Sequence, residues 1–207
     1  MNKVNRIEVI MRISAAVVLY LALLASPHIS MAEEESGSQL FQSSANGCLA
    51  PLDRSLRALH SNNEHDLCEL SKGKVVMVVN TASQCGFTGQ FADLEELHKT
   101  YQDQGLLILG FPSDSFRQEF ADEEDTAEVC FRNFGVSFPM MATTSVRGDD
   151  ANPLFAALRD ATGQEPRWNF HKYVISADGK TISSFGSRVN PTASEIVDVI
   201  EAAIAAR

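Results

Sequence analysis

Cysteine is the residue type whose chemistry stands out in this sequence, and it occurs at Cys48, Cys68, Cys85 and Cys130. No two of these residues are spaced as C-x-x-C, so the sequence contains neither a zinc-knuckle pair nor a two-cysteine redox motif. The five histidines are scattered without the spacing of metal ligands, so we predict no metal site. The sequence therefore directs attention to single thiols and to the segments that position them.

Cys85 lies where an apolar segment gives way to a helical pattern. The residues from Lys74 to Val79 form an apolar, largely β-branched run that is typical of a strand buried in the middle of a sheet. A helical pattern begins near Gly89. A thiol between a strand end and a helix start lies near unpaired backbone N–H groups and the positive end of a helix dipole, which favours the thiolate. We therefore predict that Cys85 is a reactive sulfur.

A helix and a second strand are predicted after Cys85. Apolar residues recur at helical spacing from Phe91 to Tyr101, and the run from Gly105 to Pro112 is a second buried strand. The carboxyl ends of parallel strands joined in this way are where open α/β sheets carry their chemistry. In this chain those ends are Ser83-Gln84-Cys85 and the segment 111–114.

The remaining elements complete an α/β pattern. The sequence predicts a helix at 123–134, a strand at 139–146, a helix at 152–159 that Asn152 caps, a hairpin of 171–175 with 181–185, and a last helix that starts at a capping box of Thr192 and Glu195. This order of elements predicts a thioredoxin-like α/β fold in which a central mixed sheet is flanked by helices.

The first 32 residues have the features of a secretory signal. Lys3, Arg6 and Arg12 precede an apolar run at 13–25, and small residues at 30–32 suit cleavage before Glu33. The run of about 13 residues is shorter than the roughly 20 that a transmembrane helix needs. We predict a cleaved signal at 1–32, a flexible leader at 33–46 and one folded domain at 47–207, exported to the periplasm or secreted. An uncleaved N-terminal anchor is the alternative.

The charge of the chain limits its partners. The formal net charge of the whole sequence is −10, and removal of residues 1–32 makes it about −12. An acidic protein is repelled by nucleic acids and by anionic membrane surfaces. We therefore predict no nucleic-acid or membrane-surface partner.

Cys48 and Cys68 are candidates for a structural disulfide. Export implies an oxidising compartment, in which cysteines tend to pair. Short strand-like segments at 52–59 and 66–70, separated by turn residues, would bring the two cysteines together. A bridge that closes a loop of about twenty residues would stabilise the fold by roughly 3 kcal/mol in the chain-entropy picture. Two buried free thiols are the alternative.

Several ordered blocks of sequence resemble one family. The blocks are Val79-Asn80-Thr81-Ala82-Ser83-Gln84-Cys85-Gly86-Phe87-Thr88, Leu109-Gly110-Phe111-Pro112-Ser113 and Arg167-Trp168-Asn169-Phe170-His171-Lys172-Tyr173, with weaker blocks at 134–140 and 149–154. The chain resembles the glutathione peroxidases in their bacterial, cysteine-containing form, and the resemblance runs from about Cys48 to the last predicted helix.

The resemblance implies reduction of hydroperoxides by a cysteine that cycles through sulfenic acid. Cys85 matches the peroxidatic position, and Trp168 and Asn169 match positions that surround its sulfur. Their N–H groups suit this role because the oxygen that leaves during attack on an O–O bond needs a hydrogen-bond donor. Without the resemblance, the same residues would be a packed tryptophan and a turn asparagine. We expect Asn80 to tie loops together.

One position departs from the family. Relatives usually have a glutamine in the segment after the second strand, and alignment on Phe116 puts Ser115 at that position. Serine also donates a hydrogen bond, but its side chain is shorter. Gln118 matches a different family position. Asp114, next to Ser115, would raise the pKa of a nearby thiol.

Cys130 matches the place where thioredoxin-dependent members carry a resolving cysteine. It would condense with oxidised Cys85 to a disulfide that an external dithiol then reduces. Because a disulfide requires Cα atoms about 4.4–6.8 Å apart, a helical Cys130 would have to leave its helix, and the region 123–135 would unfold locally. The alternative is that Cys130 is a buried helix residue.

The resemblance also bears on partners and cofactors. It favours thioredoxin or a periplasmic dithiol over glutathione as the reductant, and it implies no bound cofactor and no selenium, because position 85 is cysteine. The segment between Phe155 and Trp168 lacks the insertion of tetrameric relatives, so we predict a monomer or weak dimer. A general thiol–disulfide oxidoreductase is disfavoured by the absence of C-x-x-C. An exported thioredoxin-fold redox sensor or metal-handling protein is the alternative without peroxidase turnover.

Overall fold

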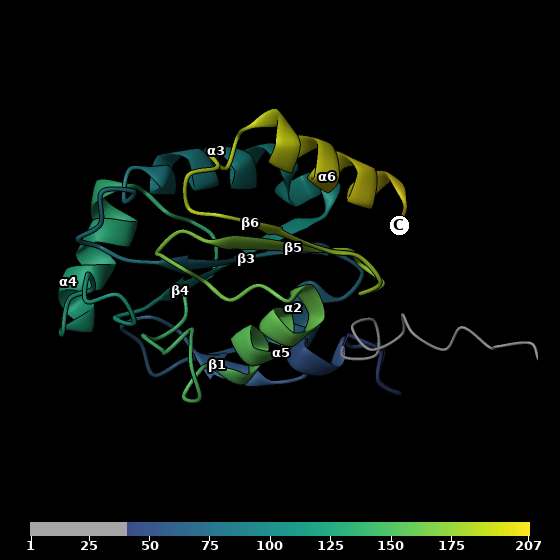
Figure 1. Cartoon of the computed structure of the whole chain (residues 1–207), viewed down its shortest axis with the longest axis horizontal. Coiled ribbons are helices and arrows are strands. Elements are labelled where there is room, and N and C mark those ends of the chain that lie inside the picture. The colour runs from purple at the N-terminus through teal and green to yellow at the C-terminus, as the bar shows by residue number, and fades with distance from the viewer. Residues whose placement is uncertain (1–40) are drawn as a thin grey trace, which may run out of the picture. The chain divides into compact units, whose positions relative to one another are not determined.

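The centre of the structure, a computed structural model that describes residues 41–207, is a four-stranded mixed sheet (Figure 1). Its strands are β3 (Val75–Thr81), β4 (Leu106–Pro112), β5 (Lys172–Ile175) and β6 (Ile182–Phe185), in the order β4-β3-β5-β6. β3 and β4 are parallel, whereas β5 is antiparallel to both β3 and β6. The predicted α/β fold with a central mixed sheet is confirmed.

Helices cover both faces of this sheet. Figure 1 shows α3 (Gln90–Tyr101) and α6 (Ser194–Ala205) on one face, and α5 (Pro153–Thr162) with α2 (Leu67–Ser71) on the other. The fully buried strand β3 divides its side chains between the two layers. Val75, Met77 and Val79 pack in the same cluster as residues of α3 and α6, and Val76 and Val78 pack with residues of α5. This alternation explains the continuous apolar run in the sequence.

The predicted strand–helix–strand unit is present. β3 pairs with β4 from Val75 opposite Leu106 to Thr81 opposite Pro112, so both strands end at the same edge of the sheet. α3 lies between them in sequence and is followed by the short 3₁₀ helix η2 (Gln102–Gln104). Gly105 then turns the chain into β4 with φ of 97°, a left-handed conformation that favours glycine.

The region between Cys48 and Lys72 differs in part from its prediction. A short hairpin of β1 (Ser55–Arg57) and β2 (Glu64–Asp66) is present, preceded by the 3₁₀ helix η1 (Ala50–Leu52). The segment 66–70, predicted as a strand, instead forms helix α2. Its first turn is capped by Asp66, whose side chain accepts a hydrogen bond from the Glu69 N–H.

Cys48 and Cys68 are joined by a disulfide, with Cα atoms 5.3 Å apart. Cys48 lies just before η1 and Cys68 lies in α2, so the bridge connects two short helices rather than two strands. The two short helices also contact each other. The bridge therefore fixes the small subdomain that precedes β3.

Two further local predictions need correction. The segment 139–146 forms only isolated bridges, Gly110 with Met140 and Ala58 with Met141, and no strand. The last helix has Ala193 at its N-cap without a side-chain bond, because the Thr192 hydroxyl donates to Asn190 instead of capping the helix. In contrast, Asn152 caps α5 as predicted, since its Oδ1 accepts from the Leu154 N–H at 3.0 Å.

The helix predicted at 123–134 has two parts. It begins as the α-helix α4 (Glu123–Ala127) and continues as a π-helical turn, η3 (Glu128–Asn133), that contains Cys130. Asp122 caps its start by accepting from the Glu124 N–H. A π-helical turn is rare and frequently lies at a functional site.

The folded part of the chain includes the end of the predicted leader. Phe41 is 1% exposed, and Ser44 and Cys48 are hydrogen bonded to each other. Residues 41–46 are therefore part of the fold, contrary to the leader boundary at 46. The predicted signal at 1–32 lies outside the described residues. Between residues 41 and 207, no helix has the length and apolar character needed to cross a membrane.

Candidate active site

Cys85 lies in the turn that connects β3 to α3, with 9% of its surface exposed. The Phe87 N–H donates to Cys85 Sγ at 3.4 Å, and Thr88 Oγ1 accepts from the Cys85 N–H at 3.0 Å. Thr88 Oγ1 also lies 2.9 Å from the Ala82 carbonyl oxygen, to which it donates. An N–H aimed at the sulfur stabilises negative charge that develops there. Because α3 begins only at Gln90, this donor comes from the turn and not from the first turn of the helix.

Trp168 and Asn169 are brought to the same edge of the sheet by the start of β5. β5 runs antiparallel to β3, and Lys172 lies opposite Val79, so the residues before β5 lie beside the end of β3. Asn80 fixes this loop: its Nδ2 donates to the Trp168 carbonyl at 3.2 Å, and its Oδ1 accepts from the His171 N–H at 3.0 Å. The prediction that Asn80 ties loops together is confirmed.

Trp168 presents its ring at the surface, with 40% of the residue exposed. The ring packs against Phe116, with centroids 5.4 Å apart, and Phe116 lies in turn beneath the guanidinium of Arg147 at 5.3 Å. A pocket of about 610 Å³ opens beside Trp168 and is also lined by Phe87, Arg167 and the segment 186–189. Phe87 connects this pocket to the Cys85 turn, although Cys85 itself does not line the pocket.

Asn169 is completely buried, and its partner is Gln118. Asn169 Nδ2 donates to Gln118 Oε1 at 3.1 Å, and the Gln118 carbonyl accepts from the Gln84 N–H at 2.9 Å. Gln118 therefore connects Asn169 to the residue just before Cys85. Asn169 Oδ1 is buried without a hydrogen-bond partner among residues 41–207. The second hydrogen of Nδ2 and the free Oδ1 leave this amide with unused hydrogen-bonding capacity.

Ser115, at the usual glutamine position, is not brought into this arrangement. Its hydroxyl accepts from the Val146 N–H at 3.1 Å and from the Ser113 hydroxyl at 3.0 Å, and it lies 3.4 Å from the Ser145 hydroxyl. These contacts face the 143–146 loop. Gln118 is thus the glutamine that the structure places beside Asn169. The Gln118-Glu119 pair in the sequence was the available signal, but alignment on Phe116 gave priority to Ser115.

Cys130 is completely buried in the core cluster that also contains Cys85. Both cysteines are free thiols. Burial, together with the negative charge of Glu119, raises the pKa of the Cys130 thiol to about 12. Cys130 in this position is a weak nucleophile.

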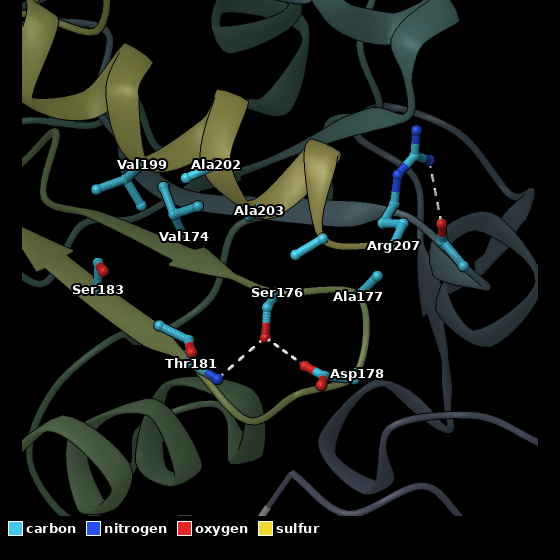
Figure 2. Close-up of a pocket in the computed structure, with 12 residues that line it drawn as sticks. Val174, Ser176, Ala177, Asp178, Thr181, Ser183, Val199, Ala202, Ala203 and Arg207 are labelled. Carbon is cyan, nitrogen blue, oxygen red and sulfur yellow. Dashed lines mark hydrogen bonds between the residues drawn. The ribbon is translucent and has the colours of Figure 1, made fainter.

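Figure 2 shows the side chains that line a second pocket, of about 580 Å³. It is bounded by α6 and the β5–β6 hairpin, with an apolar wall of Val174, Val199 and Ala203. Gly73, which precedes β3, also lines it, so this pocket lies near the amino end of the strand whose carboxyl end leads to Cys85. None of the predicted site residues lines it.

One group of potential metal ligands is present within residues 41–207. Cys48, Asp53 and Cys68 have ligand atoms within 4.8 Å of one another. The disulfide uses both sulfur atoms, and zinc requires thiolates. The group does not offer a thiolate site while the bridge is closed.

Comparisons with known proteins identify the family to which this chain is similar. The family model described as glutathione peroxidase matches residues 55–159. A glutathione peroxidase-like peroxiredoxin of Chlamydomonas reinhardtii is 44% identical over 138 residues, covering 63% of this chain and 85% of that protein. The glutathione peroxidase homolog BsaA of Bacillus subtilis is 44% identical over 137 residues, covering 62% of this chain and 86% of the homolog.

Solved structures support the same fold. A crystal structure named Trgpx, in its apo form, has a TM-score of 0.57 and 35% identity, and the match covers 75% of this chain and 95% of that one. A thioredoxin-family thiol:disulfide interchange protein from Chlorobium tepidum has a TM-score of 0.56 at 18% identity, over 73% of this chain and 92% of that one, which shows a shared fold. The ordered sequence blocks, the sheet and these matches together show that the chain belongs to the glutathione peroxidase family.

Proposed function

We propose that this protein is a thiol peroxidase that reduces hydrogen peroxide or organic hydroperoxides through Cys85. The observation that carries this proposal is the Phe87 N–H donated to the Cys85 sulfur, at the sheet edge where the loop of Trp168 and Asn169 also lies. Relatives that are named peroxidases or peroxiredoxins cover most of the domain. The proposed chemistry is a reduction carried out by the Cys85 sulfur, with electrons from an external thiol reductant.

In the first step, the Cys85 thiolate attacks one oxygen of the peroxide. An S–O bond forms as the O–O bond breaks, so the sulfur becomes a sulfenic acid and the other oxygen leaves as an alkoxide or hydroxide that takes up a proton. The Trp168 indole N–H and the second hydrogen of Asn169 Nδ2 are donors available to the departing oxygen. Gln118 holds the Asn169 amide in place.

In the second step, Cys130 returns the sulfur to a reducible state. The Cys130 thiol attacks the sulfenic sulfur, a disulfide forms, and the hydroxyl leaves with the thiol proton as water. An external thioredoxin-like or periplasmic dithiol then reduces the disulfide and regenerates both thiols. This route is favoured over glutathione because a second free cysteine is present in the same domain.

The test is a stopped-flow reaction with hydrogen peroxide and with an organic hydroperoxide. Trp168 is the only tryptophan, so its fluorescence reports on the site directly. We expect a fast first phase that Cys85→Ser abolishes and a second phase that Cys130→Ser abolishes. If the wild-type protein reacts no faster than a free thiol, it is not a peroxidase. If Cys130→Ser turns over normally with thioredoxin, Cys130 is not the resolving residue.

The same proposal includes export and a simple assembly. Cleavage before Glu33 would deliver a monomer or weak dimer to the periplasm or the medium. N-terminal sequencing of the protein from a periplasmic extract tests the cleavage site, and analytical ultracentrifugation tests the assembly. A redox sensor without turnover, the competing function, would consume one equivalent of peroxide and then stop in the presence of thioredoxin and its reductase.

A further inference from the structure

Glu119 is a buried carboxylate that the peroxidase chemistry leaves unused. The residue is 8% exposed. Its Oε1 accepts from the Ser83 N–H at 3.3 Å, from the Phe120 N–H at 2.9 Å and from Thr126 Oγ1 at 3.0 Å. Its Oε2 is also buried and has no partner among residues 41–207. Burial of a carboxylate is costly, so its presence here calls for a physical explanation.

The hydrogen bonds of Glu119 connect the two segments that carry the free cysteines. Ser83 is two residues before Cys85, and Thr126 is four residues before Cys130. Within the described part of the chain, no hydrogen bond joins the turn at 82–89 directly to the segment 123–134. The carboxylate of Glu119 is therefore the polar connection between the Cys85 turn and α4.

Cys130 has to leave its place before it can react in the proposed cycle. It is completely buried, and its segment η3 is a π-helical turn. The charge of Glu119 adds to the effect of burial in disfavouring the Cys130 thiolate. Release of α4 and η3 would relieve both effects, because the thiol would reach water and move away from the carboxylate.

We propose that Glu119 is a positioning residue for the resolving step: by fastening α4 to the Cys85 turn, its carboxylate sets how readily Cys130 is released. The inference rests on the proposed function, since it assigns the second step to Cys130. It has a chemical consequence, because a sulfenic acid that waits for Cys130 is exposed to a second peroxide and to oxidation to sulfinic acid. A stronger connection between α4 and the Cys85 turn would therefore make Cys85 more susceptible to inactivation by oxidation to sulfinic acid.

The sharpest variant is Thr126→Val, which replaces the buried hydroxyl with a methyl group of similar size. That hydroxyl lies 3.0 Å from Glu119 Oε1 and 3.4 Å from the Asp122 carbonyl oxygen, so its shorter contact is with Glu119. The carboxyl group of Glu119 and both of its N–H donors are unchanged in this variant; burial raises the pKa of that carboxyl group, and its hydrogen bonds oppose the rise. One lost hydrogen bond to a charged group corresponds to roughly a tenfold change in the opening equilibrium. We expect amide hydrogen exchange at 123–133 in the reduced protein, and the second fluorescence phase, each to accelerate about tenfold. The first phase should stay within about twofold, since no hydrogen bond joins Thr126 to Cys85.

Two further variants make the test decisive. Thr126→Ser keeps the hydroxyl and should retain the wild-type exchange and second phase. Glu119→Gln keeps an acceptor at Oε1 without the charge, and because charged hydrogen bonds are about twice as strong as neutral ones, it should change both readouts in the same direction as Thr126→Val. If Thr126→Val does not fold, Glu119→Gln provides the same test.

The outcomes separate this inference from the proposed function. If Cys130→Ser abolishes the second phase but neither Thr126→Val nor Glu119→Gln changes exchange or the second phase, the role of Glu119 is wrong and the function stands. If Cys130→Ser leaves the second phase intact, the resolving role of Cys130 fails and this inference fails with it. Equal acceleration of both phases would also overturn it, because a positioning effect on Cys130 acts on the second phase alone.

Discussion

Replacement of Lys172 by methionine should change how the stability of this protein depends on pH. Lys172 is completely buried in β5, and its Nζ donates to the Val189 carbonyl at 2.6 Å. Burial lowers the pKa of the ammonium group to about 7, although the negative charge of Asp93 partly opposes this effect. The usual value for lysine is 10.5. Methionine has a similar length and no charge, so it removes the titration while it fills the space.

The direction and size of the effect follow from these two values. Between about pH 7 and pH 10.5 the unfolded state keeps a proton on Lys172 that the folded state has released, so stability rises with pH across this window. The full difference between the two pKa values corresponds to about 5 kcal/mol in the free energy of unfolding. Of this, about 2 kcal/mol is regained as the pH rises from 7 to 9. Well below pH 7, Lys172 is protonated in both the folded and the unfolded state, so the cost of burying its charge no longer depends on pH.

Urea unfolding at pH 7 and at pH 9, followed by Trp168 fluorescence, measures this effect. The free energy of unfolding of the wild type, relative to that of Lys172→Met, should rise by about 2 kcal/mol between the two pH values. The comparison cancels the titration of the cysteines, which both proteins share. Parallel pH profiles that differ by a constant within about 0.5 kcal/mol would show that Lys172 titrates normally and that the argument from burial is wrong.

Three other substitutions have defined outcomes. Asn80→Ala leaves the Trp168 carbonyl and the His171 N–H without their partner, and it should lower the free energy of unfolding in urea by about 3 kcal/mol. Joint replacement of Cys48 and Cys68 by alanine should lower the free energy of unfolding in urea, without reductant, by roughly 3 kcal/mol and leave peroxide reduction intact. An unchanged urea midpoint would contradict a stabilising disulfide between these cysteines. Trp168→Phe keeps the ring packing and removes the indole N–H, so peroxide consumption should slow at least about tenfold, and an unchanged rate would exclude that donor.

The elements that the sequence predicted correctly have strong local signals. β3 and β4 are uninterrupted apolar runs because both of their faces are buried, and Asn152-Pro153 marks the start of α5 because the cap and the first helical position each need one residue type. Such patterns depend only on nearby residues, so they predict an element correctly without knowledge of its tertiary contacts.

The elements that were missed depend on distant partners. The segment 139–146 has strand-like residues, but its pairing with β4 and with the 55–58 region is limited to one isolated β-bridge each, which is too little to form a strand. The segment 66–70 became a helix because Asp66 caps it, and five residues are too few for periodicity to decide. The π-helical turn around Cys130 has no sequence signature, since i to i+5 bonding suits no special residue type.

In the candidate site, too, some features have a local sequence signal and others depend on residues that are distant in sequence. Cys85 could be predicted because a strand end and a helix start lie on either side of it in sequence. The pairing of Gln118 with Asn169 spans 51 positions, and it depends on Arg117, which has a positive φ of 57° and redirects the chain after Phe116. The spacing of residues in the sequence does not reveal such a turn, so alignment pointed to Ser115, whereas the structure places Gln118 beside Asn169.

The bridge between Cys48 and Cys68 places a demand on whatever dithiol recycles this enzyme. In the proposed cycle the reductant meets two disulfides on one chain and must open one while it leaves the other closed. Exchange requires a thiolate to approach a sulfur directly, and Cys48 and Cys68 are only 1% and 7% exposed. In the same proposed cycle, α4 opens before the bridge to Cys130 forms, which would expose the sulfurs of that bridge to the solvent. If the cycle runs as proposed, access selects between the two disulfides, because burial keeps a reducing thiolate away from the sulfurs of Cys48 and Cys68.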